Sequence, residues 1–524
     1  MWWGNNGRSF QLFENDKLVD SGDLTANSPN AQTHTSTLTN RAPGTYSYKV
    51  VVTNSKGSVT ATNSYTVTDY GTAPTPPAPP VTTSSISISP GDSTTQQVAQ
   101  LVVKQGQTAS FNLNEDGVKS PQYRLTFSNP GVIKSSQVSA QGVMTLTASD
   151  QLGRTALKIE DPNTHAVRYV GIVTVDKNNN RPGLPTYLAV GSVSQDDTAT
   201  INFWQQFGPG ETNKRVDIRY IYLNNGPYNG WSTWGNRVPT FVNNSLKLGM
   251  IPFFVYYNIN NGSDSLYAIK ENMQNKDFME AYFKDLKLAV TQAKTAANGE
   301  RVGFVLEADM LGYFQQAEPN KSPKEQPVLT NAAYSSGVLD ANDPQFENNI
   351  TGLVKAINYI IRKYDSTAIL GWQLNLWANP QDNGGTGIIH ATDSCNQTDA
   401  TCIAQARQKI INNAKGLMQY GLAAEINYKA DFVSIDKYGL DGGQQANAKN
   451  SPEKSTWFWN ATLWNNYLLF VNTLHQESNL PIVLWQIPVG HINSPTSISP
   501  YSNQPFAVLP NTNAKYEDSA GTFS

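Results

Sequence analysis

From Leu184 onward, short apolar segments alternate with segments that have the period of an amphipathic helix. The apolar segments are Tyr187–Val190, Val216–Leu223, Met250–Tyr257, Val302–Leu306, Ile369–Leu374, Phe432–Ile435 and Ile482–Ile487. The two clearest helical stripes are Phe278, Tyr282, Leu286 and Val290, and Leu353, Ile357, Ile360 and Ile361. Because a strand followed by a helix returns the chain parallel to the first strand, this alternation predicts a parallel α/β domain.

Roughly eight such units would close a (β/α)8 TIM-type barrel. Seven are clear, so we expect a (β/α)8-like domain over 184–524 that is truncated at its C-terminus. A doubly wound open sheet is the alternative. No Gly-rich phosphate loop follows the first strand, which disfavours nucleotide chemistry, and we expect no cofactor.

The first part of the chain has a different periodicity. Residues 1–70 alternate apolar and polar side chains, as in Thr45–Thr53, and 86–178 hold a second series of short strands. Period-two strands broken by turns predict two all-β, immunoglobulin-like sandwiches. Between them, 71–85 is a Pro/Thr-rich linker, which favours an extended, semi-rigid spacer.

Composition narrows the class of function. Only 15% of the residues are charged, and 11 Trp and 24 Tyr accompany many amide and hydroxyl side chains. Aromatic faces stack on sugar rings and amides bind hydroxyls, so this composition is typical of secreted carbohydrate-active proteins. The net charge of -3 disfavours nucleic acid, and no apolar run could span a membrane. We expect a secreted monomer whose signal peptide is missing from this sequence.

The only two cysteines, Cys395 and Cys402, lie seven residues apart in one loop. This spacing favours a local disulfide in an oxidising compartment, with two free thiols as the alternative. Two cysteines alone do not form a closed metal site, so we expect no metal.

Polar and aromatic residues cluster at the predicted strands, and the reactive groups of such domains lie at carboxyl ends of strands. The candidates are Asp217, Arg219, Glu307, Asp309, Trp372, Gln373, Asn375, Trp377, Asp436, Tyr438, Trp485, Gln486 and His491. No nucleophile-elbow serine motif accompanies them.

Glu307 and Asp309 form the most informative pair. If the strand extends that far, residues two apart share one face, and two close carboxylates raise the pKa of one of them. Glycosidic hydrolysis needs such an acid and a second carboxylate. We expect Glu307 to be the acid and Asp436 or Asp309 to be the base, nucleophile or orienting group. The alternatives are that Asp309 caps a helix and that Asp436 pairs with Lys437 or an arginine.

The other candidates would bind substrate. Gln373, Asn375 and Gln486 could hold sugar hydroxyls, although a hydrogen-bonded layer inside the sheet would use the same side chains. We expect sugar-ring platforms at Trp372, Trp377 and Trp485, further contacts at Asp217, Arg219 and His491, and a hydrogen bond from Tyr438 to the reacting centre.

The first module resembles the fibronectin/Ig-like chitin-binding module of secreted bacterial chitinases. The shared residues are Trp3-Gly-Asn-Asn-Gly7, Phe10–Asp16 and Ala42–Gly57. The resemblance covers about 70 residues and implies chitin binding through Trp2 and Trp3. Residues 86–178 resemble a bacterial Ig-like spacer.

The last domain is similar to family 18 chitinases only in part. Their fourth strand ends in Asp-x-x-Asp-x-Asp-x-Glu, and aligning that glutamate with Glu307 places Glu300, Gly303 and Val305 at the three aspartates. The aspartate that orients the acetamido group is therefore absent. We expect a glycoside hydrolase acting on chitin or a related β-linked glycan. The alternatives are a non-catalytic glycan-binding adhesin and a hydrolase of another glycan, such as peptidoglycan.

Overall fold

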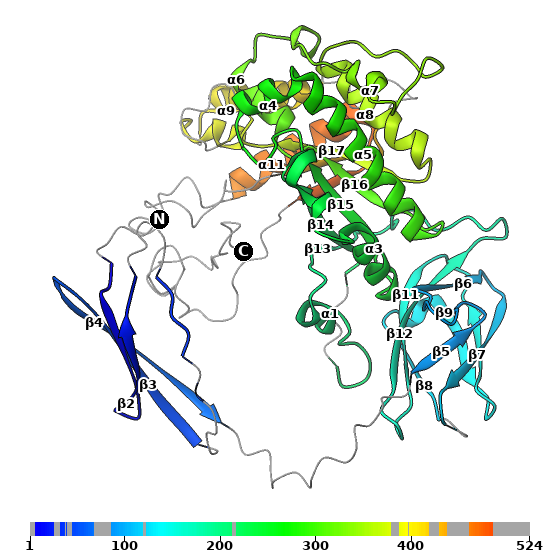
Figure 1. The fold of residues 1–524 in the computed structure, drawn as a ribbon. Helices are drawn as coiled ribbons and strands as arrows, with labels where there is room; N and C mark the ends of the chain where they lie inside the picture. Colours follow the sequence, from blue (N-terminus) through cyan, green and yellow to red (C-terminus); the bar gives the residue numbers. More distant parts are fainter. Residues whose placement is uncertain are drawn as a thin grey trace. The chain divides into compact units, whose positions relative to one another are not determined.

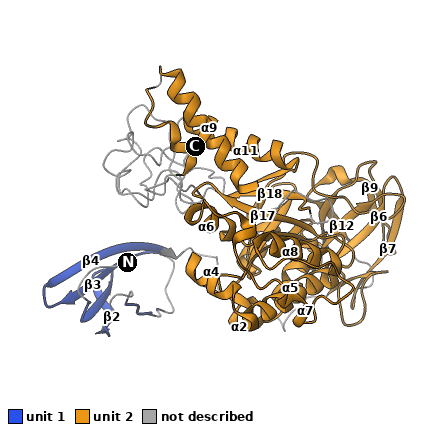
Figure 2. Cartoon of the chain, turned by 90° about the horizontal axis from the view of Figure 1, so that it is seen from above, with its two compact units in different colours: residues 1–82 blue, residues 83–524 orange. Residues whose placement is uncertain are grey.

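The structure is a computed structural model with two compact units, Met1–Thr82 and Thr83–Ser524 (Figure 2). It describes residues 6–25, 32–36, 38, 44–67, 85–118, 122–211, 216–378, 387–396, 398–418, 429–436 and 461–485.

The first unit contains one antiparallel sheet in the order β2-β1-β3-β4. Its strands are β1 (Ser9–Glu14), β2 (Lys17–Asp23), β3 (Gly44–Asn54) and β4 (Gly57–Val67). Asn15 and Asp16 both have positive φ, which matches the tight hairpin between β1 and β2. The described strands form a single layer, so the two-layer sandwich predicted for this module is wrong for the part of it that is described.

The second module contains two four-stranded sheets, ordered β5-β7-β10-β9 and β6-β12-β11-β8. The strands are β5 (Ile86–Ser89), β6 (Gln100–Lys104), β7 (Thr108–Glu115), β8 (Arg124–Phe127), β9 (Ile133–Val138), β10 (Val143–Ala148), β11 (Arg154–Glu160) and β12 (Val167–Val175). Alternate residues such as Met144 and Leu146 are buried in one apolar cluster with Leu157 and Ile172. The period-two pattern therefore forms the core of this module.

Seven parallel strands form the sheet of the α/β region, in simple chain order from β13 to β19. They are β13 (Gly191–Val193), β14 (Ile218–Asn224), β15 (Ile251–Tyr257), β16 (Gly303–Leu306), β17 (Ile369–Asn375), β18 (Phe432–Asp436) and β19 (Ile482–Trp485). The longer helices are α3 (Arg237–Lys247), α5 (Lys276–Ala297), α8 (Ile350–Tyr364), α9 (Ala400–Met418) and α11 (Ala461–Ser478). Figure 1 shows α5 and α8 lying against β15 to β17.

Shorter helices occupy the connections. They are α1 (Thr198–Trp204), α2 (Gly226–Asn229), α4 (Leu266–Met273), α6 (Met310–Ala317) and α7 (Ala332–Ser335), together with 3-10 turns at Pro130–Val132, Trp231–Thr233, Pro323–Glu325 and Ile388–Thr392. Among the described residues, no helix combines the length and apolarity that crossing a bilayer requires.

The predicted (β/α)8 barrel is wrong. The sheet has seven strands, and β13 and β19 are its two edges, with no ladder joining them among the described residues. The sheet is nevertheless strongly curled. Its curl brings the ring of Tyr220 on β14 to within 4.3 Å of the ring of Trp485 on β19, measured between centroids. Strand–helix alternation is the same in open and closed sheets, so the pattern could not show whether the edges pair.

The concave face of this sheet carries its own apolar cluster. Phe253, Val255, Val305 and Phe432 belong to it. The helix-covered face carries a larger cluster that includes Phe254, Phe304, Trp372 and the α5 and α8 stripes. Parallel strands buried on both faces give continuous apolar runs, which explains the sequence Ile251–Tyr257.

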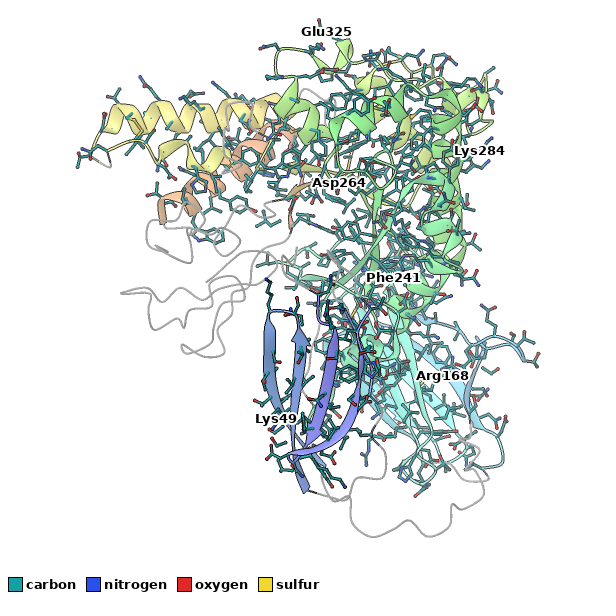
Figure 3. All side chains as sticks on the ribbon, turned by 60° about the vertical axis from the view of Figure 1, so that its left-hand side comes forward. Lys49, Arg168, Phe241, Asp264, Lys284 and Glu325 are labelled. Carbon is teal, nitrogen blue, oxygen red and sulfur yellow. A yellow bond between two sulfur atoms is a disulfide. The ribbon has the colours of Figure 1, made fainter. Side chains whose placement is uncertain are left out.

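The second module packs directly on the α/β region. Arg154 of β11 forms a bidentate ion pair with Glu300, with N···O distances of 2.8 and 3.2 Å, and both side chains are buried. Gln100 and Arg181 contact the same carboxylate. Helix α3, which carries Phe241 in Figure 3, approaches β12 so closely that a Cβ on Gly171 would lie 1.8 Å from the carbonyl oxygen of Leu246.

Candidate active site

The carboxyl edge of the curled sheet brings together polar side chains from four successive strands. Tyr257 ends β15, Asp309 follows β16, Asn375 ends β17 and Asp436 ends β18. Asn375 and Asp436 are direct partners in the β17–β18 ladder, so their side chains lie on the same face. Both are buried, at 0% and 4% exposure, which removes them from competing water.

Asn375 connects the two candidate carboxylates. Its Nδ2 donates to Oδ1 of Asp309 at 2.9 Å and to the carbonyl of Ala308 at 3.1 Å, and it lies 3.5 Å from Oδ2 of Asp436. One amide nitrogen thus contacts Asp309 and Asp436, which come from different strands. The structure therefore brings these two predicted residues together.

Asp309 is also joined to a third carboxylate, Asp264, through a tyrosine. The hydroxyl oxygen of Tyr257 lies 2.8 Å from Asp264 Oδ1 and 3.0 Å from Asp309 Oδ2. Asp264, labelled in Figure 3, lies in the loop between β15 and α4. A phenol has a single proton, so both contacts are hydrogen bonds only when one carboxyl is protonated and donates to the phenol oxygen.

The surroundings of Asp309 favour its protonated form. Burial raises its pKa to about 6, and the nearby negative charge of Asp264 acts in the same direction. Hydrogen bonds from Tyr257 and Asn375 oppose the rise without cancelling it. A carboxyl that stays protonated to this pH can act as a general acid.

The helix-capping alternative for Asp309 does not describe its contacts. Asp309 is the residue before α6, but its side chain makes no capping hydrogen bond. Its two oxygens contact Tyr257 and Asn375 instead. The side chain is therefore directed to the carboxylate cluster and not to the helix backbone.

Glu307 lies in a different environment. The strand ends at Leu306, so the condition for Glu307 and Asp309 to share a face is not met. The Glu307 carboxyl is fully buried and accepts hydrogen bonds from the Tyr282 hydroxyl and from the backbone N–H groups of Asn258 and Ile259. It contacts helix α5 and the β15 loop, away from Asn375 and Asp436.

Two tyrosines of β14 line the same concave face. Burial raises the pKa of Tyr220 to about 12, and the charge of Asp436 adds to the rise. The pKa of Tyr222 rises further, for burial first and then for its neighbours Tyr220 and Asp436. Both phenols stay neutral and can act as hydrogen-bond donors. The Tyr220 ring also packs against Trp485.

An aromatic pair stands beside Asp309. The rings of Tyr313 on α6 and Trp377 after β17 have centroids 5.1 Å apart, and both residues are partly exposed. Trp377 is thus in a position to stack on a sugar ring next to the carboxylates.

Gly312 is required for this arrangement, because a Cβ there would lie 2.5 Å from Asn375 Oδ1 and 2.9 Å from the Trp377 ring. Alanine normally stabilises a helix relative to glycine. Here we expect Gly312→Ala to displace Asn375 and reduce kcat by about 10²-fold, the cost of a ~1 Å misplacement. Gly131→Ala, where the nearest atom is 3.6 Å away, is the matched control. Full activity of Gly312→Ala in steady-state assays would show that Asn375 has no fixed role.

Three of the predicted substrate contacts are placed elsewhere. Asp217 and Arg219 lie at the amino end of β14, the opposite edge of the sheet. Asp217 binds the Tyr187 hydroxyl, and buried Arg219 binds Ser194 and Ser245. Trp372 faces the helices, where its Nε1 donates to Asn358. The strand direction places Asp217 and Arg219 at the amino edge of the sheet. The alternation of side chains along β17 turns Trp372 to the face that the helices cover.

Gln373 points to the concave face, one layer below Asn375 and paired in register with Ser434. It is buried, as expected for a layer inside the sheet.

Five of the predicted site residues lie outside the described residues: Trp2, Trp3, Tyr438, Gln486 and His491. Cys395 and Cys402 form a disulfide. Among the described residues, no group of three or more His, Cys, Asp or Glu side chains is arranged to hold a metal ion.

Sequence reasoning missed Tyr257, Asp264 and Tyr313. Tyr257 is the last residue of an apolar strand and reads as core, and Asp264 stands in the polar turn Asn258–Asp264. The position of Tyr257 at the carboxyl end of a predicted strand was the available signal.

Comparison with known protein families found no match, and none of the curated proteins compared with the chain matched it. Among solved structures, the fibronectin(III)-like modules of CbhA from Clostridium thermocellum are 13% identical, covering 35% of this chain and 87% of theirs, with a TM-score of 0.14. EndoBT-3987 from Bacteroides thetaiotamicron is 13% identical, with 66% and 74% covered and a TM-score of 0.21. A beta-glucuronidase from Bacteroides uniformis is 9% identical, with 91% and 49% covered and a TM-score of 0.27. These scores are too low to carry an argument, so the function is argued from the site.

Proposed function

We propose that this protein is a glycoside hydrolase in which Asp309 is the general acid and Asp436 is the second carboxylate. The observation that carries the proposal is the Asp264–Tyr257–Asp309–Asn375–Asp436 chain of contacts at the carboxyl edge of the sheet. Asp309 lies within it as a carboxyl that retains its proton to a pH of about 6. Paired carboxyls with different protonation states are what glycosidic hydrolysis requires.

Each residue has a defined part in this reaction. Protonated Asp309 donates its proton to the leaving-group oxygen as the glycosidic bond breaks. Asp436 stabilises the positive charge that develops on the sugar ring. It acts either as the base that takes a proton from the attacking water, or as the nucleophile that bonds to the sugar and is then displaced by water. Asn375 holds both carboxyls in place, and the negative charge of Asp264 helps to keep the pKa of Asp309 raised. Asp309 regains its proton from the water that is consumed in hydrolysis or from solvent. A sugar ring stacks on Trp377 and Tyr313.

The proposed substrate is chitin or a related β-linked glycan. The support is the similarity of residues 1–70 to a chitin-binding module and the amide- and aromatic-rich composition. The proposal includes secretion, because the disulfide between Cys395 and Cys402 is typical of oxidising compartments. Peptidoglycan and a non-catalytic, glycan-binding role are the alternatives that the experiment separates.

The test is sugar release from chitin, cellulose, mannan and peptidoglycan, followed as a function of pH. Because catalysis needs protonated Asp309, we expect kcat/KM on the cleaved glycan to fall as the pH rises through about 6. Asp264→Asn removes a negative charge that raises the pKa of Asp309, so the fall in kcat/KM should occur at lower pH in this variant. The matched control is Asp217→Asn at the other edge of the sheet, which should not change the pH at which kcat/KM falls. Binding without release from any glycan would favour the adhesin.

A further inference from the structure

Glu307 joins the ends of β15 and β16 through both its backbone and its side chain. Its N–H donates to the carbonyl of Tyr256 at 2.8 Å. Its carboxyl oxygens accept from the N–H groups of Asn258 and Ile259, each at 3.2 Å. These donors are the two residues that immediately follow Tyr257. The Glu307 side chain therefore holds the turn by which Tyr257 leaves the strand.

The backbone of Glu307 changes the direction of the chain before Asp309. Its φ is +41°, in the left-handed region that a glutamate adopts only at an energetic cost. Such a conformation persists only where the surroundings fix it, and here four hydrogen bonds do so. Because of this turn, Asp309 contacts Tyr257 and Asn375 instead of continuing the strand.

The same carboxyl is held from the helix side. Tyr282 of α5 donates to Glu307 Oε1 at 2.9 Å, and the Glu307 side chain is 0% exposed. Asp285, Tyr256 and Tyr282 are the other titratable groups in this layer, and burial raises the pKa values of all of them. Burial likewise raises the pKa of Glu307 to about 8 against its three hydrogen bonds. No cation balances this carboxyl among its described contacts, so it does not serve as half of an ion pair.

We propose that Glu307 is a positioning residue that sets the distance between the Tyr257 hydroxyl and the Asp309 carboxyl by bonding the turn after β15 to the turn after β16. The proposal rests on the proposed role of Asp309 as general acid. Glu307 does not touch substrate. It acts through the residues on either side of it, and it fixes the geometry in which Asp309 keeps its proton.

The experiment compares Glu307→Gln with Asp285→Asn. Glutamine keeps the shape of the side chain, but its NH2 group cannot accept a hydrogen bond, whereas both oxygens of Glu307 keep a lone pair even when the carboxyl is protonated. The bond from Asn258 or Ile259 is therefore lost, and the turn must shift. Asp285 is the matched control, because it is a buried carboxyl of the same layer that bonds Tyr256 and Trp231 but neither residue of the turn. Asp285→Asn should lower stability without moving the Asp309 titration.

For Glu307→Gln we expect kcat to fall by about 10²-fold with little change in KM, as for a ~1 Å misplacement. We also expect the Asp309 carboxyl, followed by carbon-13 NMR, to titrate at a different pH in this variant than in the wild type. Tyr282→Phe, which removes one of the three bonds, should shift the titration in the same direction by less and covers the case in which the glutamine variant does not fold.

An unchanged Asp309 titration in both Glu307→Gln and Tyr282→Phe overturns the proposal. An equal shift in Asp285→Asn also overturns it, because the effect would then be general packing. The titration does not depend on turnover. A chain that cleaves no glycan therefore contradicts the proposed function, while the NMR result still decides the role of Glu307.

Discussion

Asp309→Asn is expected to reduce glycan hydrolysis by about 10²–10⁴-fold, the contribution of a positioned general acid. Asparagine has the same shape: its Oδ1 can still accept from Asn375, and its Nδ2 can donate to the Tyr257 oxygen as a protonated carboxyl does. It has no proton of suitable acidity for the leaving oxygen. The loss should appear in kcat, because the interaction is made only as the bond breaks. Substrates with good leaving groups should regain activity, since they need little protonation.

Stability distinguishes this loss from unfolding. The carboxyl of Asp309 is held with a raised pKa, so its charged form is disfavoured in the folded protein, and a neutral amide should leave the melting temperature unchanged or higher at pH 7. Asp217→Asn at the amino edge is the matched control and should keep full activity. A variant Asp309→Asn that hydrolyses glycans at the wild-type rate would remove Asp309 from the mechanism.

Glu300→Gln is expected to lower the free energy of unfolding by about 3–5 kcal/mol at pH 7, the cost of removing one partner of a buried ion pair. Its carboxylate accepts two bonds from Arg154 and lies 3.7 Å from Arg181. Both arginines would keep their charge with no partner at this position. Because Arg154 belongs to β11 and Glu300 precedes β16, the lost stability is that of the contact between the second module and the α/β region.

The effect of Glu300→Gln should depend on pH in a defined direction. Burial acts to raise the pKa of Glu300, but Arg154 outweighs it, and the pKa lies below its ordinary value. A lowered folded-state pKa gives stability that is full above the unfolded pKa of about 4.3 and is lost as pH falls through the folded value. Urea unfolding of wild type and variant should therefore differ at pH 7, and the difference should shrink as the pH falls below the unfolded pKa and through the lowered folded pKa of Glu300.

The control for this prediction is an exposed ion pair. Lys276 and Glu280 are four residues apart on α5, and Lys276 is largely exposed. Lys276→Met should change stability much less than Glu300→Gln, because water and salt screen an exposed pair. If Glu300→Gln costs no more than this variant, the buried pair does not hold the second module in place.

Local sequence patterns could predict some residues of the candidate site and not others. Asp309, Asn375 and Asp436 could be selected because each follows an apolar strand, and the carboxyl ends of parallel strands share one edge. Glu307 follows the same strand as Asp309, yet its positive φ sends its carboxyl to the helix layer. Asp217 and Arg219 were misplaced because they begin their strand and do not end it.

The amino-acid sequence by itself indicated β14 to β19, the apolar stripes of α5 and α8, and which residues could be acids. Its first predicted strand, Tyr187–Val190, is wrong, because β13 begins only at Gly191. The hydrophobic period and the residues that favour turns are local properties, so they can be recognised from neighbouring residues in the sequence. Only the tertiary structure decided that no ladder joins β13 to β19 among the described residues, that Arg154 meets Glu300, and that Tyr257 contacts both Asp264 and Asp309. These contacts join residues far apart in the chain. The pairing of strand edges, the direction of each strand and the φ of Glu307 determine these contacts. A local sequence pattern does not predict any of the three.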